Sequence, residues 1–354
     1  MRKYRPPRWH FDIGFDSLAS SCLHLLGNVR GGPLIVAIIL GFDWVVSRLL
    51  IEDPQAGRQV DRKGITALWW AAWAERLNMM RILVETHQVD FARSDRGGRS
   101  PVSWAASRPA NAVILTYLLD ELNLEPDTLD RQGRSPLSYS AEIYCYRNID
   151  ALLRTGKVNI NSVDNEGRTP LVKATQLQFR AKVTKRNPAE RKYKMRRVSS
   201  AIATLRLLDH APDVNLQDVE GNTALINAAQ NRVVEGVRAL IRHGADVNVQ
   251  DIHGRTALAH AAEKLCFESV EALLKAGADA NLCDDEGRSP LWLATESMNH
   301  LLPRYDIHGK MENMRGVAGL LQSSKGEDGG LKSHGRGEDL VRNHTCEEGL
   351  IKVV

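Results

Sequence analysis

The sequence predicts an all-α solenoid, in which about eight helix-turn-helix repeats stack in line and short β-hairpin fingers join them. Three observations predict this fold. A twelve-residue motif recurs seven times along the chain. Five of the six intervals between copies are 33 to 35 residues long. Each copy also carries the residue types that a tight turn followed by a helix requires.

The motif is D-x-x-G-x-[TS]-[PA]-[LV]-x-x-[AS]-[AT]. Its seven copies begin at Asp61, Asp95, Asp130, Asp164, Asp218, Asp251 and Asp284. One interval, from Asp164 to Asp218, is 54 residues, which equals one period plus an insertion. An eighth, degenerate copy keeps the register ahead of the others at Pro33-Leu34, and it suits an N-terminal cap. Repeats are therefore expected to begin near residues 31, 61, 95, 130, 164, 218, 251 and 284.

Each motif position has a physical role, which the Asp251 copy illustrates. The aspartate can accept hydrogen bonds from its own turn, and Gly254 permits the left-handed backbone that the turn needs. Thr256 is a suitable N-cap, and the Ala or Pro that follows suits the first helical position. Leu258 then enters the core. A second helix ends in paired aliphatic residues, and Gly244 is placed as the helix stop of the preceding repeat.

The period and the motif resemble the ankyrin repeat, over most of residues 32–322. The GR[ST]PL form of several copies is similar to that of ankyrin proteins of filamentous fungi. The resemblance implies a stack of helical hairpins whose partners sit on the concave face, built from finger tips and the first helices.

Composition argues against a membrane protein. Of the 354 residues, 43% are hydrophobic and 25% are charged, which are ordinary globular values. One apolar run, Leu34–Leu40, continues to Ile51. Asp43 and Arg48 interrupt it, and each would be costly at the centre of a bilayer. We therefore expect a pair of buried helices there rather than a membrane span.

The sequence carries no motif that indicates catalysis. It lacks a phosphate-binding loop, an H-E-x-x-H zinc pair and a G-x-S-x-G nucleophile elbow. His253 and His260 are seven residues apart, which is no metal signature. The five cysteines are odd in number and form no C-x-x-C pair, which favours a reducing, intracellular compartment. We expect no enzyme activity, no cofactor and no metal.

The finger tips are the first, second and fourth residues after each motif aspartate. In the first three full repeats they carry a charge of +6, whereas in the last four they sum to −1. A basic surface attracts acidic partners. The predicted partner contacts are Arg62, Lys63, Arg96, Arg99, Arg131 and Arg134. The alternative is that the recurring arginines at the fourth position pair with nearby aspartates and stay solvated.

Three tryptophans lie close together in the first full repeat, at Trp69, Trp70 and Trp73. A helix that buries only one side cannot bury all three. Trp73 is the expected exposed anchor for a partner, because aromatic residues are enriched in binding hot spots. Packing in the core or between repeats is the alternative interpretation.

The insertion at residues 180–198 is strongly basic. Residues 180–197 hold nine basic residues and one acid, a charge of +8 in a chain whose total is +4. The basic pairs resemble a loose two-part nuclear localisation signal. Its residues are Lys185, Arg186, Arg191, Lys192, Lys194, Arg196 and Arg197. A solvated loop without a targeting role is the alternative, and the single aromatic residue Tyr193 makes nucleic-acid contact an unfavoured reading.

These observations predict an N-terminal extension at residues 1–30, a repeat array at residues 31–322 and a disordered tail at residues 323–354. The second helix of the split fourth repeat is expected to begin only near Ser200. The predicted function is a non-catalytic adaptor or scaffold that binds protein partners. The alternative is a sensor or targeting module of a larger complex, such as a fragment of an immune-type receptor or a substrate adaptor of a ligase, and a nuclear regulatory protein is a weaker one. We expect a monomer in the cytoplasm, with the nucleus as the alternative compartment.

Overall fold

The computed structural model describes residues 33–53, 55–58, 60, 64–85, 93–177, 188–301 and 316–323. The chain divides into two compact units, residues 1–97 and 98–354. The predicted extension at residues 1–30 lies outside the described residues, as does the predicted tail from residue 324 onward. Those two predictions therefore stay predictions.

The first unit holds two helical hairpins. Its helices are α2 (Pro33–Leu40), α3 (Asp43–Glu52), α4 (Ala67–Trp73) and α5 (Leu77–Glu85), with a 3₁₀ turn η1 (Ala56–Arg58) before α4. Helix α2 packs on α3, α4 packs on α5, and α2 packs on α4. The apolar run that begins at Leu34 forms α2, and Ile38 within it is fully buried. The degenerate first copy is thus a helical hairpin, as its register predicted.

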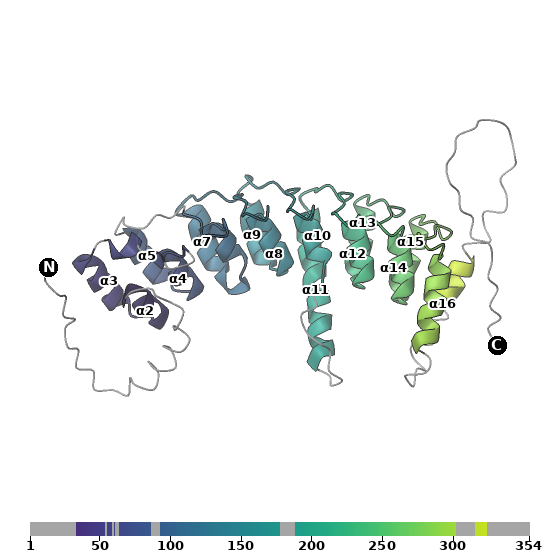
Figure 1. Cartoon of the computed structure of the whole chain (residues 1–354), viewed down its shortest axis with the longest axis horizontal. Helices are drawn as coiled ribbons and strands as arrows, with labels where there is room; N and C mark the ends of the chain where they lie inside the picture. Colours follow the sequence, from purple (N-terminus) through teal and green to yellow (C-terminus); the bar gives the residue numbers. More distant parts are fainter. Residues whose placement is uncertain are drawn as a thin grey trace. The chain divides into compact units, whose positions relative to one another are not determined.

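The second unit holds its own row of hairpins (Figure 1). Its first helices are α6 (Pro101–Ala106), α8 (Pro136–Glu142), α10 (Pro170–Thr175), α12 (Ala224–Gln230), α14 (Ala257–Glu263) and α16 (Pro290–Leu301). Its second helices are α7 (Ala112–Asp120), which follows the 3₁₀ turn η2 (Pro109–Asn111), α9 (Tyr146–Leu153), α11 (Pro188–Leu208), α13 (Val234–Arg242) and α15 (Phe267–Lys275). A last helical segment covers residues 316–323. Within each row, every helix packs on the next helix of the same row, from α6 to α16 and from α7 to α15.

The predicted cap positions fold as the motif requires. In the second unit the side chain of the N-cap Ser or Thr accepts a hydrogen bond from the backbone amide three residues later, as Thr223 does from Ile226 at 3.3 Å. Gly221 has φ of +73°, in the left-handed region that favours glycine. Thr66 is an exception, because its hydroxyl makes no cap hydrogen bond although it occupies the N-cap of α4.

The fingers are turns rather than strands in the described residues, where only isolated bridges such as Gln250 with Thr256 occur. Successive fingers are joined by one backbone hydrogen bond each. The amide nitrogen of Val219 donates to the carbonyl of Glu166 at 2.9 Å, and that of Ile252 donates to Glu220 at 3.0 Å. The fingers therefore form a continuous edge along the second unit, at the same ends of the first helices.

Helix α11 differs from the prediction. It begins at Pro188, not near Ser200, and is 21 residues long. Half of the basic insertion is therefore helical rather than a loop, because the chain from Pro188 onward joins the second helix of its repeat without a break. Residues 178–187 lie outside the described residues.

The core runs along the interface between the two rows of helices. The motif leucines Leu137, Leu225 and Leu258 are each at most 1% exposed, and so are the second-helix residues Leu152 and Leu240. The repeated small residues, such as Ala228, let neighbouring first helices approach closely. Of the helices in the described residues, none combines the length and the apolar character needed to cross a bilayer.

Candidate binding surface

The motif aspartates of the second unit organise the finger tips. In each finger from Asp130 onward, the Oδ1 atom accepts two backbone amides, those of the second and fourth residues after it. These two hydrogen bonds close the turn, and the second carboxylate oxygen, Oδ2, remains available for another hydrogen bond. The repeats differ in which side chain donates to Oδ2.

In three repeats an arginine four residues after the aspartate supplies that partner. Arg134 binds the Oδ2 of Asp130 through Nε at 2.9 Å and Nη2 at 2.8 Å. Arg168 binds Asp164 in the same way, and Arg288 binds Asp284. Burial alone would raise the pKa of these aspartates, but the hydrogen bonds outweigh it, so the pKa of each is lowered.

A second donor comes from the ninth residue after the aspartate, on the first helix. Tyr139 donates its hydroxyl hydrogen to Asp130 at 2.7 Å, and the Nζ of Lys173 lies 3.0 Å from Asp164. The side chains of Lys173 and Asp164 are 3% and 2% exposed, so this ion pair is buried. The fingers that begin at Asp130 and Asp164 are therefore each fastened to their first helix by a long polar side chain.

The Asp251 repeat uses a histidine at the ninth position. The Nε2 of His260 lies 2.8 Å from the Oδ2 of Asp251, and both side chains are almost fully buried. Burial acts to raise the pKa of Asp251, and the bonds from His260 and the turn amides lower it more strongly. His260 thus fastens the Asp251 finger to α14. Arg255 of this repeat reaches forward instead, to Asp284 at 3.4 Å and to Glu263 at 3.1 Å.

The Asp218 repeat has neither donor. Its fourth position is Asn222, whose side chain donates to Glu220 at 3.2 Å, and its ninth position is Asn227. Within the described residues no cation lies within ion-pair distance of Asp218. Desolvation raises the pKa of Asp218, and the turn amides and the nearby Asn222 amide lower it too little to reverse the shift. Among the described motif aspartates of the second unit, Asp218 is therefore the one whose repeat offers neither an arginine at the fourth position nor a long donor at the ninth or from a neighbouring repeat.

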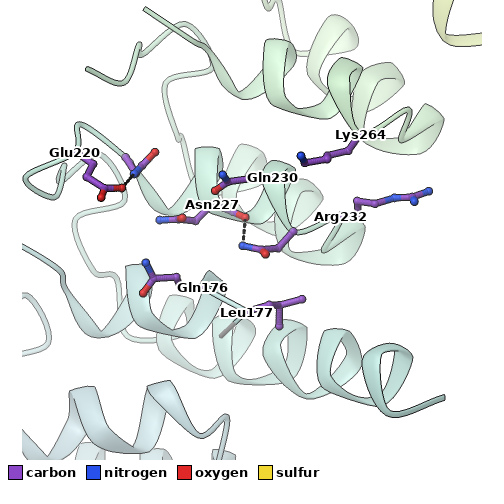
Figure 2. A pocket seen from close by; sticks show the side chains of 9 residues that line it. Gln176, Leu177, Glu220, Asn227, Gln230, Arg232 and Lys264 are labelled. Carbon is purple, nitrogen blue, oxygen red and sulfur yellow. Dashed lines mark hydrogen bonds between the residues drawn. The ribbon is translucent and has the colours of Figure 1, made fainter. Parts of the chain in front are cut away.

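A polar hollow of about 410 Å³ lies beside this repeat. Its lining residues come from the end of α10, the Asp218 finger, α12 and the end of α14: Gln176, Leu177, Glu220, Asn222, Asn227, Gln230, Asn231, Arg232 and Lys264. Figure 2 shows Glu220 at one end and Arg232 with Lys264 at the other, with the amides of Gln176 and Asn227 between them. The sequence reasoning missed this site. The available signal was the pair of asparagines, at positions where the sister repeats carry arginine and a longer donor.

The predicted partner contacts lie in different environments. Arg62 and Lys63 are outside the described residues, and Arg96 is exposed in the first unit. In the second unit Arg131 is exposed, but the guanidinium groups of Arg99 and Arg134 lie over the rings of Trp104 and Tyr139, at 5.4 and 4.5 Å. The alternative that the recurring arginines pair with nearby aspartates therefore describes Arg134, Arg168 and Arg288, which pair with the aspartate of their own finger, and Arg255, which pairs with that of the next. A role in partner binding stays a prediction for the set.

The three tryptophans of α4 divide between core and surface. Trp69 is 2% exposed, whereas Trp73 is 38% exposed. Trp70 lies between them in exposure and meets Trp73 edge to face, with ring centroids 5.7 Å apart. Trp73 is thus available at the surface, where we predicted an anchor for a partner.

The proposed nuclear signal is only partly described. Lys185 and Arg186 lie outside the described residues, while Arg191, Lys192 and Lys194 belong to the backbone of α11. Arg196 and Arg197 follow on the same helix. An exposed apolar stripe lies on this helix at Met195, Val198, Ile202 and Leu205. The spacing of three, seven and ten residues is helical and was visible in the sequence, once the helix is known to begin at Pro188.

Among the described residues, no group of three histidine, cysteine or acidic side chains is arranged to hold a metal ion. Cys145 and Cys266 are buried free thiols.

Comparison with known proteins agrees with the repeat architecture. A family model described as "Ankyrin repeats (3 copies)" matches residues 34–130 and 198–284, just over half of the chain. The mouse protein "Ankyrin repeat domain-containing protein 63" is 41% identical over 131 residues, which cover 36% of this chain and 33% of that protein.

Two other relatives have different names, and one of them comes from a fungus. "NF-kappa-B inhibitor delta" of Mus musculus is 32% identical over 127 residues, covering 35% of this chain and 36% of that protein. "Ankyrin repeat protein nuc-2" of Neurospora crassa is 27% identical over 150 residues, which cover 42% of this chain and 13% of that protein. The chain thus spans about a third of the length of the first relatives. The relatives thus include both mammalian and fungal proteins.

Proposed function

Because the chain belongs to the ankyrin repeat family, we propose that it is a non-catalytic adaptor or scaffold that binds protein partners through its finger tips and first helices. Ankyrin repeats are protein–protein interaction modules. One observation carries the proposal furthest: the finger edge presents repeat-specific side chains, such as Arg131 and Glu220, on a turn that is the same in the fingers from Asp130 onward. A constant frame with variable tips is suited to recognition rather than to chemistry.

Affinity purification with mass spectrometry tests this proposal. We expect wild-type protein to capture a defined set of proteins, and the charge reversals Arg96→Glu and Arg131→Glu to lose the acidic members of that set. Both side chains are exposed, so the fold should not be affected. Arg147→Glu is the matched control, because Arg147 is exposed in the first turn of the second-row helix α9, where an acidic side chain is favourable.

Three outcomes separate the candidates. Loss of partners with the finger variants but not with Arg147→Glu supports the adaptor. Capture of an ATPase or a ligase as the main partner favours the alternative, a sensor or targeting module of a larger complex. Identical partners for all variants would remove the basic finger tips as the binding surface.

Localisation is a separate proposal, with the cytoplasm favoured and the nucleus as the alternative. Nuclear import is tested by alanine substitution of Lys185, Arg186, Arg191 and Lys192 in the tagged full chain. These changes leave the repeat part of α11, from Val198 onward, intact. A nuclear signal that is unchanged by the four substitutions would remove the import proposal.

A further inference from the structure

Helix α11 carries an apolar stripe on its exposed side. Met195, Val198, Ile202 and Leu205 are 38% to 65% exposed, and their helical spacing places them on one face over about 15 Å. Among the described helices, α11 holds four exposed large apolar residues, and each of the others holds at most two. Single apolar residues on a surface are ordinary, whereas a contiguous set marks a contact surface. We refer to these four residues as the α11 stripe.

The packing of α11 fixes the direction in which the stripe points. Ser200 donates its hydroxyl hydrogen to the carbonyl of Ala174 in α10 at 2.5 Å, and Thr204 and Leu207 are buried on the same side. At about 100° per residue, Ser200 lies opposite the middle of the stripe. The α11 stripe therefore faces away from the first helices, on the outer side of the second-helix row.

Other second helices carry charged side chains where α11 is apolar. When the paired aliphatic residues near the ends of these helices are aligned, Ile202 and Leu205 occupy positions that are charged in α9, α13 and α15. Those positions hold Arg147 and Asp150, Glu235 and Arg238, and Glu268 and Glu271. The stack therefore does not require apolar residues at these positions.

The stripe also continues onto a part of α11 that has no counterpart in the neighbouring second helices. In the same alignment, α9, α13 and α15 begin at the position of Ala201. Helix α11 begins at Pro188 and is 21 residues long, so it extends past α9 and α13 (Figure 1). Met195 and Val198 lie on this extension, with the exposed Arg196 between them. Half of the stripe is thus presented on a helix that projects from its row.

The charge beside the stripe selects the kind of partner. Residues 180–197 carry a net charge of +8, and a single acid within them cannot neutralise it. Such a segment attracts acidic groups and repels a second copy of itself. The outer positions of the flanking helices α9 and α13 carry both signs of charge, including Asp150 and Glu235. A broad anionic surface such as a bilayer would meet these acids, so a narrow acidic ligand is favoured.

We propose that the α11 stripe docks an amphipathic helix of a protein partner, with apolar residues on one face and acidic residues beside them. The four anchors follow the spacing by which one helix recognises the apolar face of another. The acidic residues of the partner lie towards the basic end of α11, near Arg196. This surface is separate from the finger tips, and the inference rests on the proposed function only in that the partner is a protein.

The test is a titration of the full chain with a labelled synthetic peptide, measured by fluorescence anisotropy. The probe is a capped peptide of about four helical turns, with leucines at the spacing of the stripe and alanines and glutamates elsewhere. The control peptide has lysine in place of each glutamate and keeps the same apolar face. We expect saturable binding of the acidic peptide, and binding of the basic peptide that is about tenfold weaker or more. Equal binding of the two peptides, or binding of neither, would overturn the inference.

Two paired substitutions separate the apolar stripe from the basic charge. Ile202→Glu with Leu205→Arg installs the residues that α13 carries, so the stripe is interrupted while the net charge is unchanged. Met195→Gln with Val198→Gln changes only side chains that are more than half exposed, so it should not affect folding. We expect each pair to weaken binding of the acidic peptide about tenfold.

The matched control is Glu235→Gln with Arg238→Gln, which alters the same outer positions of α13 without a change in net charge. This control should bind the acidic peptide like wild type. Wild-type binding by both stripe variants would show that the basic segment alone holds the peptide, and the inference would fail.

Other occupants of the stripe give different results. Flotation with vesicles of phosphatidylcholine and phosphatidylserine tests a lipid surface, and analytical ultracentrifugation tests self-association. Vesicle binding or a dimer that is lost with Met195→Gln and Val198→Gln, in a protein that does not bind the acidic peptide, would overturn the inference.

The two proposals fail separately. If the acidic peptide does not bind but the finger variants Arg96→Glu and Arg131→Glu still lose partners, the inference about α11 is wrong and the adaptor function stands. If the peptide binds while the finger variants capture the same partners as wild type, the stripe is the binding surface and the finger tips are not.

Discussion

Asp164 and Asp218 offer a matched pair of substitutions. They occupy the same position in successive repeats, and the Oδ1 of each accepts two turn amides. Asparagine at either position keeps an Oδ1 acceptor for those amides and removes the negative charge. The comparison of Asp164→Asn with Asp218→Asn therefore isolates what Oδ2 contributes.

The structure gives different magnitudes for the two changes. Asp164 pairs with Lys173 at 3.0 Å, and both side chains are at most 3% exposed. Removing one partner of a buried ion pair costs about 3–5 kcal/mol, since the other charge is left without compensation. Asp218 has no such cation in the described residues. Because Asp218→Asn removes an uncompensated charge, we expect a change in the free energy of unfolding within about 0.5 kcal/mol, or a gain.

Urea unfolding at pH 7, followed by circular dichroism and by tryptophan fluorescence, measures both changes. The two signals must give coincident transitions for a single free energy to apply, because repeat arrays can unfold in parts. Asp164→Asn should lower the urea midpoint strongly, and Asp218→Asn should leave it nearly unchanged. Equal losses in the two variants would refute the reasoning, since they would show that Oδ2 contributes the same in both repeats.

The pH dependence has opposite signs in the two repeats. The pKa of Asp164 is lowered, so its stabilisation is fully present above the ordinary carboxyl pKa and is lost as pH falls through the lowered value. The deficit of Asp164→Asn should therefore shrink only in strong acid. The pKa of Asp218 is raised, so its unfavourable charge is relieved as pH falls through the raised value. Any advantage of Asp218→Asn should disappear there, at a higher pH than the Asp164 effect.

Three further changes test the fingers and caps by the same urea assay. Tyr139→Phe removes a buried 2.7 Å hydrogen bond to Asp130 and should cost about 1–3 kcal/mol, so an unchanged midpoint would contradict its role as a fastener. Gly221→Ala should cost more than Gly244→Ala, because both have positive φ but only at Gly221 would the new Cβ lie 2.9 Å from a backbone nitrogen, that of Ile252. Thr223→Ala removes the N-cap of α12 and should lower the free energy of unfolding by about 1 kcal/mol. A loss no larger than that of an alanine substitution at an exposed surface position would contradict the capping role of Thr223.

Some features of this protein followed from the sequence alone. The repeat period, the first helices and the finger turns are specified by neighbouring residues in the sequence. Gly221 permits the left-handed backbone of its turn, and Thr223 marks where α12 begins. Such rules act over a few residues, so they can be read without knowing the neighbours in space. The buried leucines follow for the same reason, because the motif repeats them at one position of every hairpin.

Tertiary structure alone decided the rest. Whether Arg134 faces a partner or its own aspartate depends on the distance from its guanidinium to Asp130, and the sequence left both readings open. The start of α11 at Pro188 depends on how the inserted chain joins the packed part of the helix. The hollow beside Asp218 is visible only once neighbouring repeats are stacked, because its lining comes from three of them. Residues close in sequence determine each hairpin. The space between hairpins depends on how long the side chains of neighbouring repeats are once those repeats are packed together.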